Sequence, residues 1–219
     1  MEESSPQQRA MLEPVAHTDD QSVRTPPTLG PEKLGFQRLA AALGFSQPVD
    51  DSLSEAVFIC IDCEAFEFAQ DKVTEIGIAI LDTREVAPSA AKSDTESMTA
   101  AIRCAHYRPV EYSNLMNKKR VKGCPDCFGF GVSTWIRLAD AKQVLERIFA
   151  DPARLQEAAE FGAIIPNTHR PIILVGHGLT NDEQYLRRLG FSTTNMRSIV
   201  GYADTQELAG MGMYALCKC

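Results

Sequence analysis

The sequence predicts an α/β fold, a mixed β-sheet with helices on its faces. Three apolar segments rich in β-branched residues follow one another between residues 57 and 107, and such segments favour strands. Beyond residue 138, segments with helical periodicity alternate with further apolar runs. Strands in succession, followed by alternating helix and strand, are typical of a mixed sheet covered by helices. With 219 residues and 44% apolar side chains, the chain can bury a core.

Five segments account for the expected sheet. The first two are expected to pair as a hairpin across the polar turn at Gln70 to Lys72. The fourth is an apolar run that stops at a glycine turn, as a buried strand does. The expected strands are Val57 to Cys63, Val73 to Leu81, Ala101 to Tyr107, Ile172 to Gly176 and, more weakly, Ser198 to Ala203.

Four segments carry apolar residues at helical spacing. The first follows Pro31, a residue suited to a first helical turn, and the last precedes Gly190, which is placed as a helix C-cap would be. The expected helices are Glu32 to Phe45, Ala139 to Ala150, Arg154 to Phe161 and Asn181 to Leu189.

The chain divides into three parts. Residues 1–51 hold six of the twelve prolines and eight acidic against four basic side chains, which predicts a disordered acidic leader around the short helix at residues 32–45. Residues 55–208 form the expected domain, with a mobile surface loop at Thr83 to Thr99. Residues 209–219 are expected to be a tail.

Composition excludes several classes of protein. The net charge of −7 excludes a polycation that coats nucleic acid, and the longest apolar runs, six residues, are far below the roughly 20 that a membrane helix needs. The first residues carry no secretory signal, so we expect an intracellular protein of the cytoplasm or nucleus. The seven cysteines are then expected to be mostly reduced.

Two carboxylates stand at the end of the first expected strand. Asp62 and Glu64 are two residues apart and therefore lie on the same face of a strand. Such a pair is costly unless a cation lies between the two groups, and carboxylate oxygens favour magnesium or manganese. The alternative is that the strand ends here and both side chains are solvated.

A second element joins strand, glycine turn and helix within residues 172–189. Asp182 lies in the first helical turn, where the helix dipole favours a negative charge. Taken alone, however, Asp182 is better explained by an ordinary capping role. His177, in the glycine turn, is more often a turn-stabilising side chain than a ligand.

These two elements resemble the first two motifs of the DEDD superfamily of 3′-to-5′ exonucleases, which have a ribonuclease H-like fold. The first motif is Asp-x-Glu, here Asp62 and Glu64, followed by a strand such as 74–79. The second is Gly-His-x-x-x-x-Asp-x-x-x-Leu, here Gly176, His177, Asp182 and Leu186.

A closer resemblance is to the fungal family related to the factor "good for full DEAD-box activity", whose C-terminal domain is ribonuclease H-like. It covers about residues 56–208. The stretches that carry it are Asp62 to Glu67, Thr74 to Thr83, Glu111 to Ser113, Val121 to Asp126 and Ile173 to Gly190.

The resemblance implies a site in which Asp62, Glu64 and Asp182 hold two divalent ions, Mg²⁺ or Mn²⁺, for phosphodiester hydrolysis. It also implies a fourth aspartate, preceded by a histidine five residues earlier or a tyrosine four residues earlier. No such pair follows the second motif in these 219 residues, and Asp204 better matches the family's next strand. We therefore expect a C-terminally truncated ribonuclease H-like fold with an incomplete site.

A basic segment offers a nucleic-acid contact. Between residues 103 and 123, six basic side chains face the single Glu111, a local balance of +5, with Tyr107 and Tyr112 interleaved. The segment could follow a phosphate backbone and stack a base, although a solvated loop explains it as well. The basic residues are Arg103, Arg108, Lys118, Lys119, Arg120 and Lys122.

The spacing of the cysteines suggests an alternative function, a structural zinc site. Cys124 and Cys127 form a Cys-x-x-Cys pair, and Cys217 and Cys219 could complete a structural zinc site, although their spacing is poor. A thioredoxin-like role does not fit, because that motif should open a helix after a strand.

The first hypothesis is a nucleic-acid-binding ribonuclease H-like domain with an incomplete two-metal site, whose partner is single-stranded RNA or DNA. The second is an active metal-dependent 3′-to-5′ exonuclease completed by another segment or a partner. The third, implied by the resemblance alone, is a protein-interaction factor in messenger RNA export or helicase regulation.

Overall fold

The protein is described from a computed structural model. The structure describes residues 31–46, 53, 55–86, 95–120, 122–160, 170–194 and 196–216. The expected disorder of residues 1–30 and the mobile loop at residues 87–94 lie outside these ranges.

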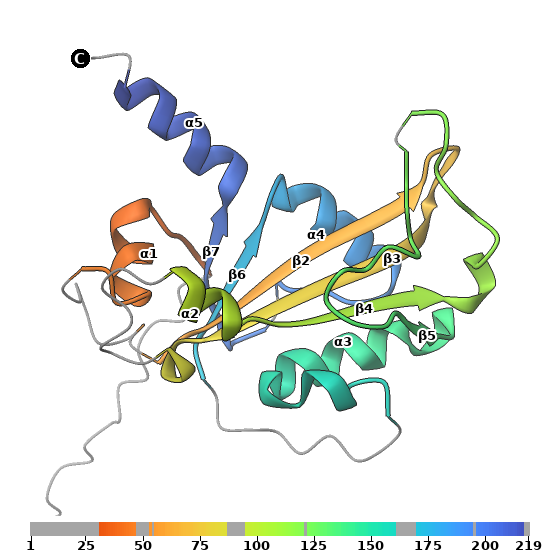
Figure 1. Ribbon diagram of the computed structural model, residues 1–219, viewed down its shortest axis with the longest axis horizontal. Helices are drawn as coiled ribbons and strands as arrows, with labels where there is room; N and C mark the ends of the chain where they lie inside the picture. The colour runs from red at the N-terminus through yellow and green to blue at the C-terminus, as the bar shows by residue number, and fades with distance from the viewer. Residues whose placement is uncertain are drawn as a thin grey trace, which may run out of the picture.

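Within the described residues, seven strands form one sheet in the order β1-β7-β6-β2-β3-β4-β5 (Figure 1). Strand β3 is antiparallel to its neighbours β2 and β4, and the other pairs are parallel. The strands are β1 (Glu32–Lys33), β2 (Val57–Phe66), β3 (Ala69–Asp82), β4 (Arg103–Pro109), β5 (Thr134–Ile136), β6 (Ile172–Gly176) and β7 (Ile199–Asp204). The mixed sheet with flanking helices confirms the predicted α/β, ribonuclease H-like fold.

The hairpin of β2 and β3 is longer than the sequence predicts. Its turn is Glu67–Phe68, so the expected turn at Gln70 to Lys72 is wrong, and these residues belong to β3. Glu67 accepts backbone hydrogen bonds from a distant loop, and the Phe66 and Phe68 rings contact each other edge to face. Tertiary contacts of this kind leave no trace in local turn propensity.

Helices cover both faces of the sheet. The α-helices are α1 (Phe36–Ala42), α2 (Thr95–Ala100), α3 (Ala141–Ala150), α4 (Leu179–Arg188) and α5 (Thr205–Leu216). Short 3₁₀ helices connect them: η2 (Thr83–Glu85), η3 (Val110–Tyr112), η4 (Leu138–Asp140) and η5 (Pro152–Glu157). None of the helices in the described ranges is long and apolar enough to cross a membrane.

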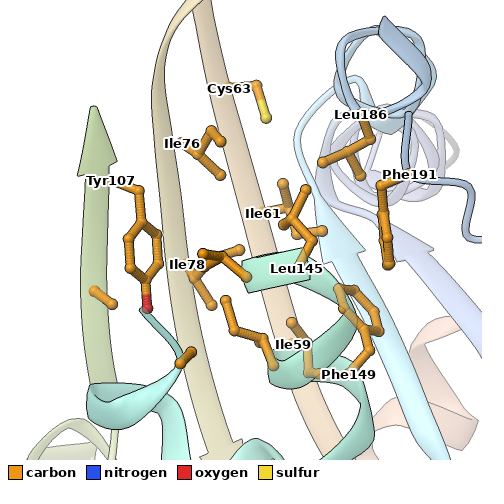
Figure 2. Packing of buried hydrophobic residues seen from close by; sticks show 14 of the residues in the cluster. Ile59, Ile61, Cys63, Ile76, Ile78, Tyr107, Leu145, Phe149, Leu186 and Phe191 are labelled. Atoms are coloured by element: carbon orange, nitrogen blue, oxygen red, sulfur yellow. The ribbon is translucent and has the colours of Figure 1, made fainter. Parts of the chain in front are cut away.

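The larger part of the core lies on one face of the sheet, under α3, α4 and η5 (Figure 2). Ile59, Ile61 and Cys63 of β2 point into it because alternate strand residues share a face. Leu145 and Phe149 of α3 meet them, and the Phe149 ring lies 5.1 Å from that of Phe191.

The opposite face is covered over only part of its length. Phe58 of β2 packs there with Leu39 of α1 and Leu81 of β3. The next residues of β2 on this face are Cys60, Asp62 and Glu64, and the last two are exposed. The acidic pair therefore lies on the same face of the sheet as α1, beyond the point where the apolar packing ends.

Several elements differ from the predictions. Glu32 and Lys33, predicted as the start of a helix, form strand β1 instead, and α1 begins only at Phe36. Strand β5 is unpredicted, and both strands are too short to show periodicity. Helix α2 lies at the end of the expected surface loop, and α5 extends into the expected tail. The helix expected at Arg154 to Phe161 is not an α-helix over its described residues, 154–160: η5 (Pro152–Glu157) starts at Pro152, and Arg154 has non-helical dihedral angles (φ −100°, ψ 33°).

Candidate functional site

The backbone of β2 is exposed on one side where it carries the acidic pair. Pairing of β2 with β6 ends at Cys60 and Val175, whereas pairing with β3 continues past Glu64 and Glu75. Beyond Cys60, the edge of β2 therefore faces the start of α4 instead of another strand.

Asp182 occupies this edge. It lies in the first turn of α4 and is 5% exposed, and its Oδ1 accepts a hydrogen bond of 2.8 Å from the backbone N–H of Cys63. Cys63 separates Asp62 from Glu64 in the chain, so the contact brings the second motif directly to the first. The two elements that carry the motifs are therefore in direct contact.

The glycine turn before α4 makes this approach possible. Gly178 has a φ of +74° at the helix N-cap, a conformation that favours glycine. At Gly176, a Cβ would lie 2.6 Å from Leu179 Cδ1, so a side chain there would require the Leu179 side chain to move. His177, beside them, contacts Thr205 Oγ1 through Nδ1 at 3.1 Å, as a turn-stabilising residue would.

Burial and neighbouring carboxylates disfavour the ionisation of two carboxyl groups of the site, those of Glu64 and Asp182. Burial, followed by the charge of Asp62, raises the pKa of Asp182 to about 6 in spite of the hydrogen bond from Cys63. Burial also raises the pKa of Glu64, and the charges of Asp62, Glu75 and Asp182 add to the effect. The site is therefore a region of concentrated negative charge.

Two residues that sequence reasoning did not assign lie beside the acidic pair. Glu75 of β3 is directly opposite Glu64, and His106 of β4 lies in the same row as Gly77 and Asp62. The hairpin register would have revealed Glu75, because cross-strand neighbours share a face. Nothing in the sequence around His106 indicates that it lies beside the acidic pair.

His106 is 8% exposed and is held on both ring nitrogens. Its Nε2 lies 3.3 Å from Glu75 Oε2, and its Nδ1 lies 2.7 Å from Ser133 Oγ. Phe128 packs on the ring at 5.2 Å. The hollow over the acidic face is thus lined by the strands on one side and by the 124–130 loop on the other.

Carboxylate oxygens are the donors that Mg²⁺ and Mn²⁺ prefer. As placed, however, no three acidic, histidine or cysteine side chains of the described residues come together around a point where an ion could bind. The chemistry of the donor set fits a divalent ion, but its present geometry does not form a three-ligand site.

Asp204 has a capping role. It is 9% exposed and accepts hydrogen bonds from the N–H groups of Gly178 at 3.0 Å and Leu179 at 2.8 Å, and from Gln206. Burial opposes ionisation, but these hydrogen bonds outweigh it and lower the pKa of Asp204. Asp204 therefore fixes the start of α4, which carries Asp182.

The predicted nucleic-acid residues fall into two groups. Arg103 and Arg108 lie on opposite faces of β4 and bind groups of the protein itself. Arg103 donates to the carbonyl of Ala153 at 2.7 Å, whereas Arg108 is 6% exposed, binds Asp126 at 2.6 Å and lies over the Trp135 ring at 4.3 Å.

Lys118, Lys119, Arg120 and Lys122 are exposed. Their loop lies beside the tip of the β2–β3 hairpin (Figure 1). The idea that Tyr107 stacks a base is wrong, because Tyr107 is 2% exposed and its hydroxyl donates to the Leu155 carbonyl.

Cys124 and Cys127 form a disulfide with a Cα separation of 5.4 Å, so this pair is an exception to the expected reduced thiols. Cys60, Cys63 and Cys104 are free. The pairing leaves Cys124 and Cys127 without thiolates for zinc, and Cys217 and Cys219, the other half of that hypothesis, lie outside the described residues.

Comparison with known proteins places this arrangement in a family. Residues 57–214 match the family model DEDDh_C, described as "DNA polymerase III subunit epsilon-like, C-terminal domain". The chain belongs to the DEDDh_C family. The matched residues include both acidic motifs and all strands of the sheet except β1.

Two relatives of this DEDDh_C domain come from Saccharomyces cerevisiae. The uncharacterized protein YDR514C is 31% identical over 139 residues, which cover 64% of this chain and 26% of the relative. Good for full DBP5 activity protein 2 is 28% identical over 138 residues, which cover 62% of this chain and 21% of the relative. The match thus spans about a quarter of each relative's length. The second relative supports the resemblance to the "good for full DEAD-box activity" family.

Proposed function

We propose that this domain binds single-stranded nucleic acid, RNA or DNA, and that its exonuclease-type site is incomplete. The observation that carries the proposal is the hydrogen bond of Asp182 to the peptide between Asp62 and Glu64. It supports descent from a site in which Asp62, Glu64 and Asp182 are the catalytic and metal-binding groups. Exonucleases of this family typically use divalent metal ions.

Within these 219 residues, the parts without a counterpart are the family's fourth aspartate and the histidine or tyrosine that precedes it. Of the four histidines, His17, His106, His169 and His177, none follows Asp182 in the sequence. His106 reaches the acidic face from β4, but its ring nitrogens contact Glu75 and Ser133. Loss of a positioned base typically costs a factor of about 10² to 10⁴ in rate, so we expect very poor cleavage.

Nucleic-acid binding is supported by the exposed cations Lys118, Lys119, Arg120 and Lys122. They lie at the tip of the hairpin whose stem carries the acidic pair. Arg103 and Arg108, predicted from the sequence as nucleic-acid contacts, are left out of the proposed surface, since both bind groups of the protein itself.

Two other functions are alternatives to this proposal. A cleaving exonuclease, completed by another segment or a partner, is favoured by the presence of Asp62, Glu64 and Asp182. A protein-interaction role in messenger RNA export or helicase regulation draws only on the name of the relative, Good for full DBP5 activity protein 2.

A salt-dependent binding assay tests the proposal. Single strands should bind with an affinity that falls as salt rises. The double variant Lys118→Gln with Lys119→Gln should weaken binding and make the negative slope of log K against log [salt] shallower, by about 0.7 for each lost phosphate contact. Lys142→Gln with Arg187→Gln removes the same charge from α3 and α4 and serves as the control. Equal affinities of the two double variants would refute the role of this loop.

A further inference from the structure

The cationic loop, residues 117–123, is attached to the tip of the β2–β3 hairpin by a specific set of hydrogen bonds. The carboxylate of Glu67 accepts from three consecutive backbone N–H groups, those of Lys118 at 2.9 Å, Lys119 at 3.0 Å and Arg120 at 2.6 Å. Glu67 is 5% exposed although it lies in a two-residue turn. Its carboxylate is therefore committed to the backbone of this loop.

Asn117 provides a second attachment. Its Oδ1 accepts from the backbone N–H of Glu67 at 2.8 Å, and its Nδ2 donates to the Ala65 carbonyl at 2.9 Å. The loop closes on itself through the hydrogen bond of the Gly123 N–H to the Asn117 carbonyl at 3.1 Å. Backbone and side-chain contacts together thus attach residues 117–120 to the hairpin tip.

This arrangement aims the cationic side chains outward. Because Glu67 binds the backbone, the charged ends of Lys118, Lys119 and Arg120 are left to solvent, and none of them forms an ion pair with a carboxylate of the described residues. Lys119 Nζ and Arg120 Cζ lie 5.5 Å and 5.9 Å from the Phe68 ring centroid. Two cations are thus gathered at one exposed ring.

The loop lies close to the acidic face. Glu67 is three residues beyond Glu64, about 10 Å along a strand. A single strand that lies over the acidic face would reach the loop within a few nucleotides. The negative site alone would repel its phosphates, so nearby cations held at a fixed position would offset this repulsion.

We infer that Glu67 is a positioning residue for nucleic acid, which holds the 117–123 loop so that Lys118, Lys119 and Arg120 contact the phosphates of a single strand. The inference rests on the proposed nucleic-acid function and deepens it. A negative side chain next to a polyanion site ordinarily weakens binding, so the inference predicts an effect of the opposite sign to simple electrostatics.

The test is a titration of fluorescein-labelled oligothymidylate, about 15 nucleotides long, at several salt concentrations. Glu67→Gln should lower the affinity about fivefold or more, although it removes a negative charge. It should also make the negative slope of log K against log [salt] shallower by about 0.7 or more. Asp71→Asn is the matched control, since it removes one negative charge from an exposed residue of the same hairpin. Its affinity should equal that of the unchanged protein or exceed it.

Each outcome decides the matter. If the unchanged protein binds and Glu67→Gln binds equally well or more tightly, the inference is wrong while the proposed function stands. If the unchanged protein does not bind, both fall. If polyglutamate displaces the oligonucleotide as effectively as unlabelled oligothymidylate, the surface recognises acidic chains in general, and the assignment to nucleic acid is overturned.

A second variant protects the test against misfolding. Asn117→Ala removes the other attachment and leaves the Glu67 carboxylate unchanged, so it should reduce the affinity in the same direction. Circular dichroism melting of every variant identifies loss of fold. A folded Asn117→Ala protein with unchanged affinity and salt slope would contradict the inference even if Glu67→Gln fails to fold.

Discussion

Asp82, at the end of β3, shows how a buried charge is accommodated away from the site. It is 4% exposed, and both of its oxygens bind the guanidinium of Arg170. Burial opposes its ionisation, but Arg170 and Arg84 outweigh burial and hold the pKa of Asp82 below its ordinary value. This pair joins the end of β3 to Arg170, which lies two residues before the start of β6.

The pair predicts a pH-dependent stability. A carboxyl whose pKa is lowered by folding stabilises the protein above its unfolded-state pKa of about 4, and this contribution declines as the pH falls below that value. Asp82→Asn should lower the free energy of unfolding by about 3 kcal/mol at pH 7, and by less near pH 3. Urea unfolding at both pH values measures this, and an equal loss at both would show that the ion pair is not the cause.

At the acidic face, removing a carboxylate is expected to raise the free energy of unfolding, the opposite of its effect at Asp82. Asp62 raises the pKa of both Glu64 and Asp182, so its charge is unfavourable in the folded state at pH 7. Asp62→Asn should therefore raise the free energy of unfolding, by about 0.5 to 1 kcal/mol. Asp71→Asn, exposed on the same hairpin, is the control. Destabilisation by Asp62→Asn would argue against mutual repulsion at the site.

Among the elements, β1 is attached to the sheet through a close approach of two backbones. It pairs with β7 in parallel, and the Leu34 N–H donates to the Tyr202 carbonyl at 2.9 Å. A Cβ at Gly201 would lie 2.9 Å from the Leu34 side chain and 3.1 Å from the Glu32 carbonyl oxygen. The absence of a side chain at residue 201 is thus a condition for the pairing.

Gly201→Ala should consequently displace β1 and leave the rest of the sheet intact. Hydrogen exchange at the Leu34 amide should become faster, whereas exchange in β2 and β6 should not change. Gly35→Ala is the control, since a Cβ at residue 35 has no heavy atom within 4 Å. Normal protection of Leu34 in Gly201→Ala would contradict this account of the edge.

The sequence predicts the central elements well because each buries an apolar face of its own. Val57 to Cys63 and Ile172 to Gly176 are strands as predicted, and α3 and α4 follow their periodicity. Elements fixed by distant partners are missed: β1 depends on Gly201, and the turn at Glu67 depends on the backbone of the 118–120 loop.

The site likewise has a part that the sequence predicts and a part that depends on distant contacts. The spacing of Asp62 and Glu64 puts both side chains on one face, as alternation along a strand requires, and the structure places Asp182 against the peptide between them. The burial of Arg108 and the approach of His106 depend on the packing of β4 against the 124–135 segment. No spacing rule within the chain predicts such packing.

At the scale of the whole molecule, charge is distributed unevenly. The chain carries a net charge of −7, and the acidic face adds to its negative field, yet the exposed cations of the 117–123 loop lie at one end of the same hairpin. Association with a single strand should therefore depend strongly on ionic strength and on this loop. A protein with binding but very poor cleavage is the expected result.

The most direct test of the central claim is a cleavage time course on a 5′-labelled single strand, with Mn²⁺ present and with protein in excess of its dissociation constant. We predict that the substrate stays at full length while it is bound, because the described residues hold no counterpart of the family's fourth aspartate, and His106, the histidine at the acidic face, is held on both ring nitrogens. Stepwise shortening from the 3′ end, lost in Asp62→Asn, would contradict the claim and identify the domain as an active exonuclease.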